Sequence, residues 1–219
     1  MNKIKITFYK HILDKMDFDK VKLYKKPCVI VISGMPGSGK STLSRELSKQ
    51  LEIYLLSQDY IRSYYCINIE KYSEDKRLYI DSLAKKCNIQ RLIKLLYNRI
   101  PFVLDTDINT KKIYDQLKLI CMIFRYKLIK IKINSKDEDN IQRILNRTTG
   151  FNCVYENIIG DNVNYSTSYT QEDYYDIKKR KVPKLDNVLF DYILDNYGSN
   201  IEFLNNIDDI IQDIKIKKL

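Results

Sequence analysis

The fold of this chain is decided by the stretch Val29-Ile-Val-Ile-Ser-Gly34-Met-Pro-Gly-Ser-Gly39-Lys40-Ser41-Thr42. It contains a complete G-x-x-x-x-G-K-[ST] motif, placed between an apolar run and a helix-like segment. That strand–loop–helix context is the one in which the motif binds the phosphates of a nucleotide. The chain has only six glycines in 219 residues, and three of them fall inside this motif. We therefore expect ATP or GTP to bind here.

The residue types in the motif match what a triphosphate requires. Glycines allow backbone N–H groups to turn toward phosphate oxygens, and the next helix directs its positive end at the same anion. Lys40 would reach the β- and γ-phosphates, and the Ser41 hydroxyl would bind Mg²⁺. The other predicted ATP-binding positions are Gly34, Met35, Pro36, Gly37, Ser38, Gly39 and Thr42. The alternative is a simple connecting turn, which the scarcity of glycine elsewhere in the chain disfavours.

Five short apolar runs rich in β-branched residues alternate with helix-like segments along the chain. The runs are residues 28–33, 53–57, 102–105, 128–133 and 188–194. Helices are predicted at residues 40–50, 75–98, 110–125, 137–147 and 201–214. The second helix should break near Asn88, because its apolar residues fall on two opposite faces. The alternation predicts an α/β fold, a three-layer sandwich around a five-stranded parallel sheet.

The positive net charge of the chain has two sources: a bias in overall composition and a local surplus of basic residues. Isoleucine, lysine, asparagine and tyrosine are abundant while tryptophan is absent, which is typical of an AT-rich genome. The net charge of +10 is for that reason weak evidence for a nucleic-acid partner. Residues 76–132, however, carry 14 basic and four acidic side chains, a surplus equal to the whole net charge. This concentration favours a polyanionic partner.

Cysteine spacing and hydropathy limit where the protein works. The five cysteines are far apart and the chain has one histidine, so neither a zinc site nor a disulfide scaffold is expected. No stretch is long and apolar enough for a membrane span, and no secretory signal is present. We expect a cytoplasmic protein in a reducing, intracellular compartment, without membrane contact and of undetermined oligomeric state. We expect a basic lead-in over residues 1–27 and one domain over residues 28–219, with a polar insert, acceptor or lid region at 151–187.

Charged side chains follow the second and third apolar runs, at the edge where ligands bind in parallel α/β sheets. Asp59 could accept a proton from an attacking hydroxyl, and Arg62 could neutralise a nearby phosphate. Asp59 could equally cap the helix that begins after it. Asp105 closes the third run, and we expect it to serve Mg²⁺ or its water shell. Asn109 is expected to cap the following helix, and turn formation is an alternative role for Asp107.

Two arginines lie four positions apart on the predicted helix at 137–147. Arg143 and Arg147 would share a face of that helix. There they could close over the transferring phosphate, as an arginine finger does. They could instead belong to a solvated helix and pair with Asp139 or its neighbours. The residues alone leave both interpretations open.

Together these elements resemble the kinase domain of bacteriophage polynucleotide 5′-hydroxyl kinase. The resemblance covers residues 28–150 and rests on the glycine-rich motif, Asp59-x-x-Arg62, Asp105-Thr-Asp-Ile-Asn109 and the arginine pair. It implies a P-loop kinase fold with an arginine-bearing lid helix, ATP as phosphoryl donor, Mg²⁺ and a phage or viral source. The residue roles that it implies are ATP binding by Lys40 and Ser41, a general base at Asp59, acceptor-phosphate binding at Arg62, an essential carboxylate at Asp105 and donor-phosphate contact at Arg147.

Some features depart from that family. Twenty-seven residues precede the apolar run that leads into the motif, and the D-x-x-R spacing also occurs in small-molecule kinases such as adenylylsulfate kinases. The main prediction is transfer of the γ-phosphoryl of ATP to a 5′-hydroxyl of DNA or RNA, with residues 76–132 holding the strand. The alternative is a kinase of a nucleoside, nucleotide or other small hydroxyl compound. A third class is a non-enzymatic ATP-binding switch or nucleic-acid-end binding module.

Overall fold

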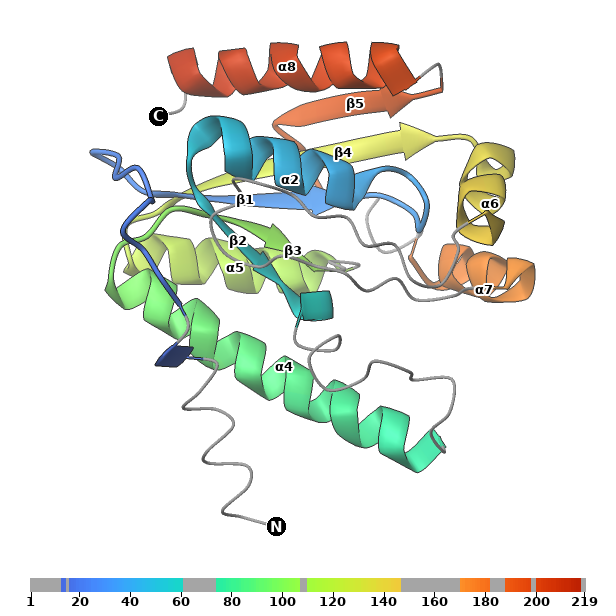
Figure 1. The fold of residues 1–219 in the computed structure, drawn as a ribbon, viewed down its shortest axis with the longest axis horizontal. Helices are drawn as coiled ribbons and strands as arrows, with labels where there is room; N and C mark the ends of the chain where they lie inside the picture. The colour runs from blue at the N-terminus through green and yellow to red at the C-terminus, as the bar shows by residue number, and fades with distance from the viewer. Residues whose placement is uncertain are drawn as a thin grey trace.

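A computed structural model describes residues 13–14, 16–60, 74–106, 110–146, 170–181, 188–197 and 200–217. They form a five-stranded, all-parallel sheet covered by helices (Figure 1). The strands are β1 (Cys28–Ser33), β2 (Tyr54–Ser57), β3 (Phe102–Asp105), β4 (Lys127–Ser135) and β5 (Tyr192–Asn196), in the order β2-β3-β1-β4-β5. The chain leaves β1 toward one edge of the sheet and later returns to the other. The carboxyl end of β1 is therefore a topological switch point, where α/β sheets bind ligands.

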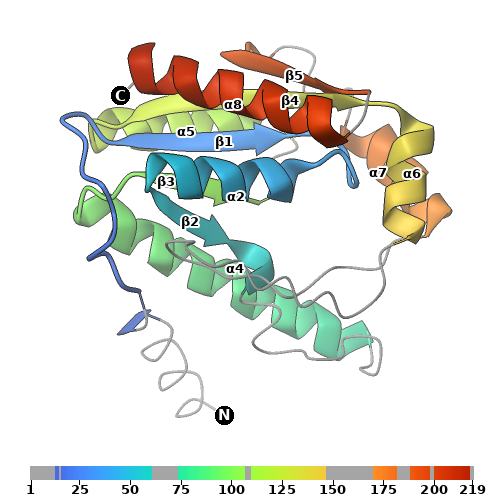
Figure 2. The same ribbon diagram turned by 45° about the horizontal axis from the view of Figure 1, so that its top comes forward.

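The helices form two layers and an additional pair. They are α2 (Lys40–Leu51), α4 (Glu74–Tyr97), α5 (Lys111–Ile123), α6 (Asp137–Leu145), α7 (Gln171–Lys181) and α8 (Asn200–Lys217). Helices α2 and α8 pack on one face of the sheet, and α4 and α5 pack on the other. Helices α6 and α7 lie together beyond the carboxyl end of β4 (Figures 1 and 2). The predicted three-layer P-loop kinase-type sandwich is confirmed.

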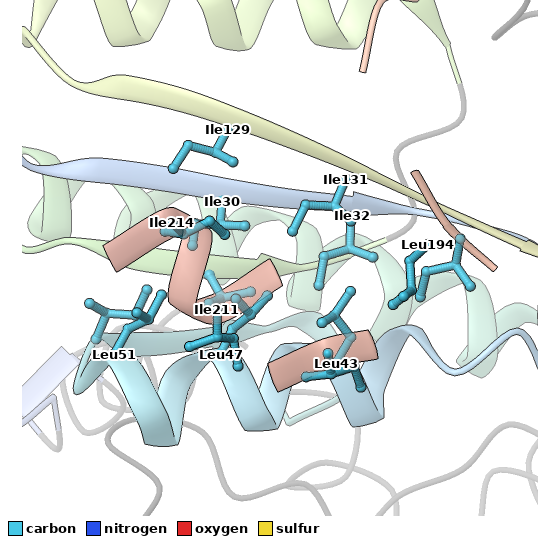
Figure 3. Close-up of a cluster of buried hydrophobic side chains, with 14 of the residues drawn as sticks. Ile30, Ile32, Leu43, Leu47, Leu51, Ile129, Ile131, Leu194, Ile211 and Ile214 are labelled. Atoms are coloured by element: carbon cyan, nitrogen blue, oxygen red, sulfur yellow. The ribbon is translucent and has the colours of Figure 1, made fainter. Parts of the chain in front are cut away.

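The central strand β1 is buried along its whole length because its successive residues face different helical layers. In β1, Ile30 and Ile32 pack toward α2 and α8, whereas Val29 and Val31 pack toward α4 and α5. Figure 3 shows the first cluster, in which Leu43, Leu47 and Leu51 of α2 meet Ile211 and Ile214 of α8 and the strand residues Ile30, Ile32, Ile129, Ile131 and Leu194. Each fully buried leucine or isoleucine contributes about 1.5–3 kcal/mol. This core holds β1, α2 and α8 together, and so fixes the position of the switch point at the end of β1.

The start of β5 differs from the prediction. The strand begins at Tyr192, although the apolar run begins at Val188. Asp191 hydrogen-bonds the backbone of Lys130 twice, through its own N–H and through its carboxylate, each at 2.8 Å. That carboxylate occupies the Lys130 N–H, so regular pairing starts one residue later, at Tyr192 with Ile131.

Helix α4 is continuous, so the predicted break near Asn88 is wrong. Its inward face contains Leu83, Ala84, Cys87, Asn88, Arg91 and Leu95, all buried. Ile89 and Ile93, by contrast, are 56% and 44% exposed. Two polar residues complete the inward face while two isoleucines project outward, so hydrophobic periodicity misjudged which face is buried.

Helix α5 is capped by Thr110, whose hydroxyl accepts a hydrogen bond from the Ile113 N–H. The predicted capping role of Asn109 is therefore wrong; Asn109 itself lies outside the described residues. Part of the predicted lead-in packs on the sheet, since Met16 and Val21 belong to the core cluster on the α4 side. Within the described residues, no helix is long and apolar enough to cross a membrane.

Candidate active site

The glycine-rich loop joins β1 to α2 at the switch point. Gly37 and Gly39 have φ angles of 80° and 100°, a left-handed region that other residues rarely adopt. A Cβ atom on Gly37 would lie 2.5 Å from the carbonyl oxygen of Asn140, and one on Gly39 would lie 2.7 Å from the Phe203 ring. Both the backbone conformation and the close packing of α6 and α8 thus require glycine.

Lys40 lies against this loop. Its Nζ donates hydrogen bonds to the carbonyl oxygens of Gly34 at 3.0 Å and of Met35 at 2.9 Å. The nearby Ser38 hydroxyl is fully buried and has no hydrogen-bond partner among the described residues. The loop therefore presents an ammonium group and an unsatisfied buried hydroxyl, both of which suit a bound phosphate.

Asp105 ends β3, the strand beside β1, and its surroundings define the site electrostatically. Burial, and after it the charge of Asp59, raises the pKa of Asp105 to about 6, although Lys40, Arg45 and the Ser44 hydroxyl act in the opposite direction. Asp59 and Lys40 therefore each lie within electrostatic reach of Asp105. Poorly solvated carboxylates that share a site attract a cation.

Asp59 follows β2 and lies two residues beyond the Ser57–Asp105 strand pair. The helical backbone already begins at Gln58, so Asp59 lies inside this turn rather than capping a helix that begins at Tyr60. The Thr106 hydroxyl donates to Oε1 of Gln58 at 3.1 Å and ties the end of β3 to the same turn. Asp59 is half-buried, and its charge acts on Asp105 at the same carboxyl end of the sheet.

Helix α6 brings Arg143 to the outer side of the loop, which is the side toward which the Gly37 carbonyl points. Its guanidinium donates to the carbonyl oxygen of Gly37 at 3.4 Å and to Oδ1 of Asn196 at 3.2 Å. Helix α6 ends at Leu145, so the helix predicted to reach Arg147 is too long. Arg147, Arg62 and Asp107 lie outside the described residues, and their predicted roles stay predictions.

Two features of this region escaped the sequence analysis. Asn196, the last residue of β5, is 4% exposed and donates from Nδ2 to the carbonyl oxygen of Ser38 at 2.9 Å. Applying the strand-end rule to the fifth strand would have found it. Helix α7, within the unassigned 151–187 stretch, holds α6 through Tyr174. Its buried hydroxyl bonds Asp137 at 2.8 Å and Asn140 at 2.9 Å.

Comparison with known proteins places the chain in a family. Residues 29–145 match the model of a family described as an AAA domain. The match spans more than half of the chain, so the chain belongs to this family. Among curated protein sequences, none matches it.

Several solved structures of similar fold are kinases by name. The fold resembles that of a proposed kinase from Chloroflexus aurantiacus, with a TM-score of 0.62 and 16% identity over 89% of this chain and 100% of that one. It also resembles a gluconokinase from Sinorhizobium meliloti, with a TM-score of 0.53 and 12% identity over 90% and 100% of the two chains. A shikimate kinase from Bacteroides thetaiotaomicron gives 0.51 and 12% over 86% and 98%. The fold is that of the P-loop kinases.

Proposed function

We propose that this protein is an ATP- and Mg²⁺-dependent kinase whose acceptor is the hydroxyl group of a small molecule, such as a nucleoside, nucleotide or other small hydroxyl compound. One observation carries the proposal: Lys40 at the start of α2 and Asp59 just after β2 both lie within electrostatic reach of Asp105, at the end of β3. A phosphate loop alone would support nucleotide binding, whereas a carboxylate on the acceptor side adds a proton acceptor. Two proteins of similar fold are named as kinases of small acceptors, which supports this choice.

The residues present suit a magnesium–triphosphate donor. The loop has glycines where a Cβ would clash, the Lys40 ammonium at its carbonyls and the buried Ser38 hydroxyl without a partner among the described residues. Ser41 and Asp105 would hold the metal ion, the carboxylate directly or through water. Hard oxygen ligands of this kind are those that Mg²⁺ prefers. The ion supplies positive charge to the β- and γ-phosphate oxygens.

In the transfer step, Asp59 would accept the proton of the acceptor hydroxyl as the hydroxyl oxygen bonds to the γ-phosphorus. The bond from that phosphorus to the β–γ bridging oxygen breaks, and ADP leaves. Lys40 would donate to the γ-phosphoryl oxygens and stabilise the charge that they carry during transfer. Arg62 is proposed to bind an anionic group of the acceptor, and Arg147 to bind the donor phosphates.

A 5′-hydroxyl of DNA or RNA is the second candidate acceptor. It is favoured by the Asp59-x-x-Arg62 spacing and by the basic surplus in residues 76–132. Exposed lysines from this stretch lie on α4 and α5, at Lys85, Lys86, Lys111, Lys112 and Lys118. Arg91, in the same stretch, is 1% exposed and unavailable to a strand.

A transfer assay with labelled ATP separates the candidates. The panel contains sugars and hydroxy acids, nucleosides, nucleotides, and DNA and RNA oligonucleotides with either a 5′-hydroxyl or a 5′-phosphate. We expect one small acceptor class to be labelled, with a KM that is insensitive to salt. Labelling of 5′-hydroxyl oligonucleotides alone, weakening steeply with salt, would support the second candidate. Nucleotide binding without transfer to any acceptor would support the non-enzymatic class.

A further inference from the structure

The outer side of the glycine-rich loop is held by one buried amide. Asn196 uses both polar atoms of its side chain there: Nδ2 donates to the Ser38 carbonyl at 2.9 Å, and Oδ1 accepts from Nη2 of Arg143 at 3.2 Å. The residue is 4% exposed, so water does not replace these partners readily. Only a short planar group with a donor and an acceptor satisfies both neighbours from this position.

The contact with Ser38 has a consequence on the inner side of the loop. In a planar trans peptide, the C=O of one residue and the N–H of the next point in opposite directions. The Ser38 carbonyl points to Asn196, so the N–H of Gly39 points to the opposite side of the loop, where the proposed function places the donor phosphates. The φ angle of 100° at Gly39 belongs to this same arrangement.

The peptide bond between Gly37 and Ser38 is held in the same manner by α6. The Gly37 carbonyl accepts a hydrogen bond from Nη1 of Arg143 at 3.4 Å. The Ser38 N–H donates to the Met35 carbonyl at 3.1 Å and closes a turn. Asn196 and Arg143 therefore donate hydrogen bonds to two consecutive loop carbonyls, those of Ser38 and Gly37, and are hydrogen-bonded to each other.

We propose that Asn196 is a positioning residue of the donor site. By holding the Ser38 carbonyl, it orients the Gly39 N–H toward the donor phosphates, and through Arg143 it sets where α6 rests on the loop. This role rests on the proposed function, because it assumes that the loop binds a nucleoside triphosphate. Through these two residues, β5 and α6 would together affect the affinity for the nucleotide, without affecting the acceptor carboxylates.

The test measures binding of a non-hydrolysable ATP analogue with Mg²⁺ by calorimetry, together with KM for ATP and for the acceptor. Asn196→Ala should weaken analogue binding and raise KM for ATP by about tenfold, because the loop carbonyl loses its buried donor. Asn196→Asp keeps the size and the Arg143 contact but replaces the donor with an acceptor, so it should fold and be at least as impaired. The acceptor KM should change by less than about twofold in both.

Two further variants distinguish positioning from general stability. Asn134→Ala removes another asparagine hydrogen bond at the same end of the sheet, an exposed one to Asp195 at 2.9 Å. It should bind the analogue like the wild type. Arg143→Met should weaken binding by itself but add less than about twofold in the Asn196→Ala background, because the two residues act on one loop.

The outcomes separate this inference from the proposed function. Wild-type protein that binds no analogue would refute the proposed function. Wild-type binding that the Asn196 variants match within about twofold would overturn the inference alone. An equal rise in the KM for ATP and for the acceptor would also overturn it, because Asn196 would then be supporting the fold rather than the donor loop.

Discussion

The donor and acceptor halves of the candidate site are built in different ways. The donor half is a short backbone loop whose shape depends on glycines and on contacts from α6, β5 and α8. The acceptor half consists of single side chains, chiefly Asp59 and Asp105, brought together from the ends of β2 and β3. A loop of this kind follows from a local sequence motif, whereas the acceptor half depends on residues far apart in the chain. Nucleotide binding can therefore be inferred more directly than the choice of acceptor.

The supports behind the two halves also differ. Behind the acceptor half lies Arg91, a cation with 1% of its surface exposed. Its Nη2 donates to the Tyr54 hydroxyl at 3.1 Å, and its guanidinium carbon lies 5.4 Å from the ring centroid of Tyr60, the residue after Asp59. Behind the donor half lies the neutral amide of Asn196. Variants can therefore disturb each half separately.

The largest effect is expected at Lys40. Lys40→Met should lower kcat/KM for phosphoryl transfer by roughly 10³-fold or more, because the charge on the transferring phosphoryl group loses its main protein cation. The measurement is steady-state transfer from labelled ATP. Lys49→Met, at an exposed position on the same helix, is the matched control and should behave like the wild type. If Lys40→Met lowers kcat/KM by less than tenfold, the loop is not the site that holds the donor phosphates.

The next effect is expected at Gly39. Gly39→Ala should weaken nucleotide binding by about 10²-fold and cost about 1–3 kcal/mol of stability, because alanine is strained at a φ of 100° and its Cβ meets the Phe203 ring. Calorimetry and thermal melting measure the two losses. Adding Phe203→Leu should recover part of the loss by relieving the clash. If it recovers nothing, α8 does not shape the loop.

Local sequence predicted one part of this site well and the parts that depend on tertiary packing poorly. The motif predicted β1, the loop and the start of α2 correctly, because glycine, lysine and apolar residues act locally there. The α4 prediction failed because Asn88 and Arg91 face inward, a result of tertiary packing that hydrophobic periodicity does not encode. Asn196 was missed because the strand-end rule was applied to the second and third strands and not to the fifth, which ends at this residue.

A smaller effect is expected at Arg91 and should be confined to the acceptor half. Arg91→Lys should raise the acceptor KM by roughly three- to tenfold with little change in nucleotide affinity, because an ammonium does not reproduce the planar contact with the Tyr60 ring. Tyr54→Phe is the matched control, since it removes one hydrogen-bond partner but keeps the ring contact. Equal changes for nucleotide and acceptor would mean that Arg91 supports the fold as a whole.

The most direct test of the central claim is Asp59→Asn, measured for nucleotide binding and for phosphoryl transfer in the same preparation. The amide keeps the shape of the side chain but no longer accepts a proton from the acceptor hydroxyl. The account predicts that the ATP analogue binds within about twofold of wild type while transfer falls by roughly 10²–10⁴-fold. Transfer that persists near the wild-type rate would contradict it, since the acceptor half would then lack its proton acceptor at Asp59.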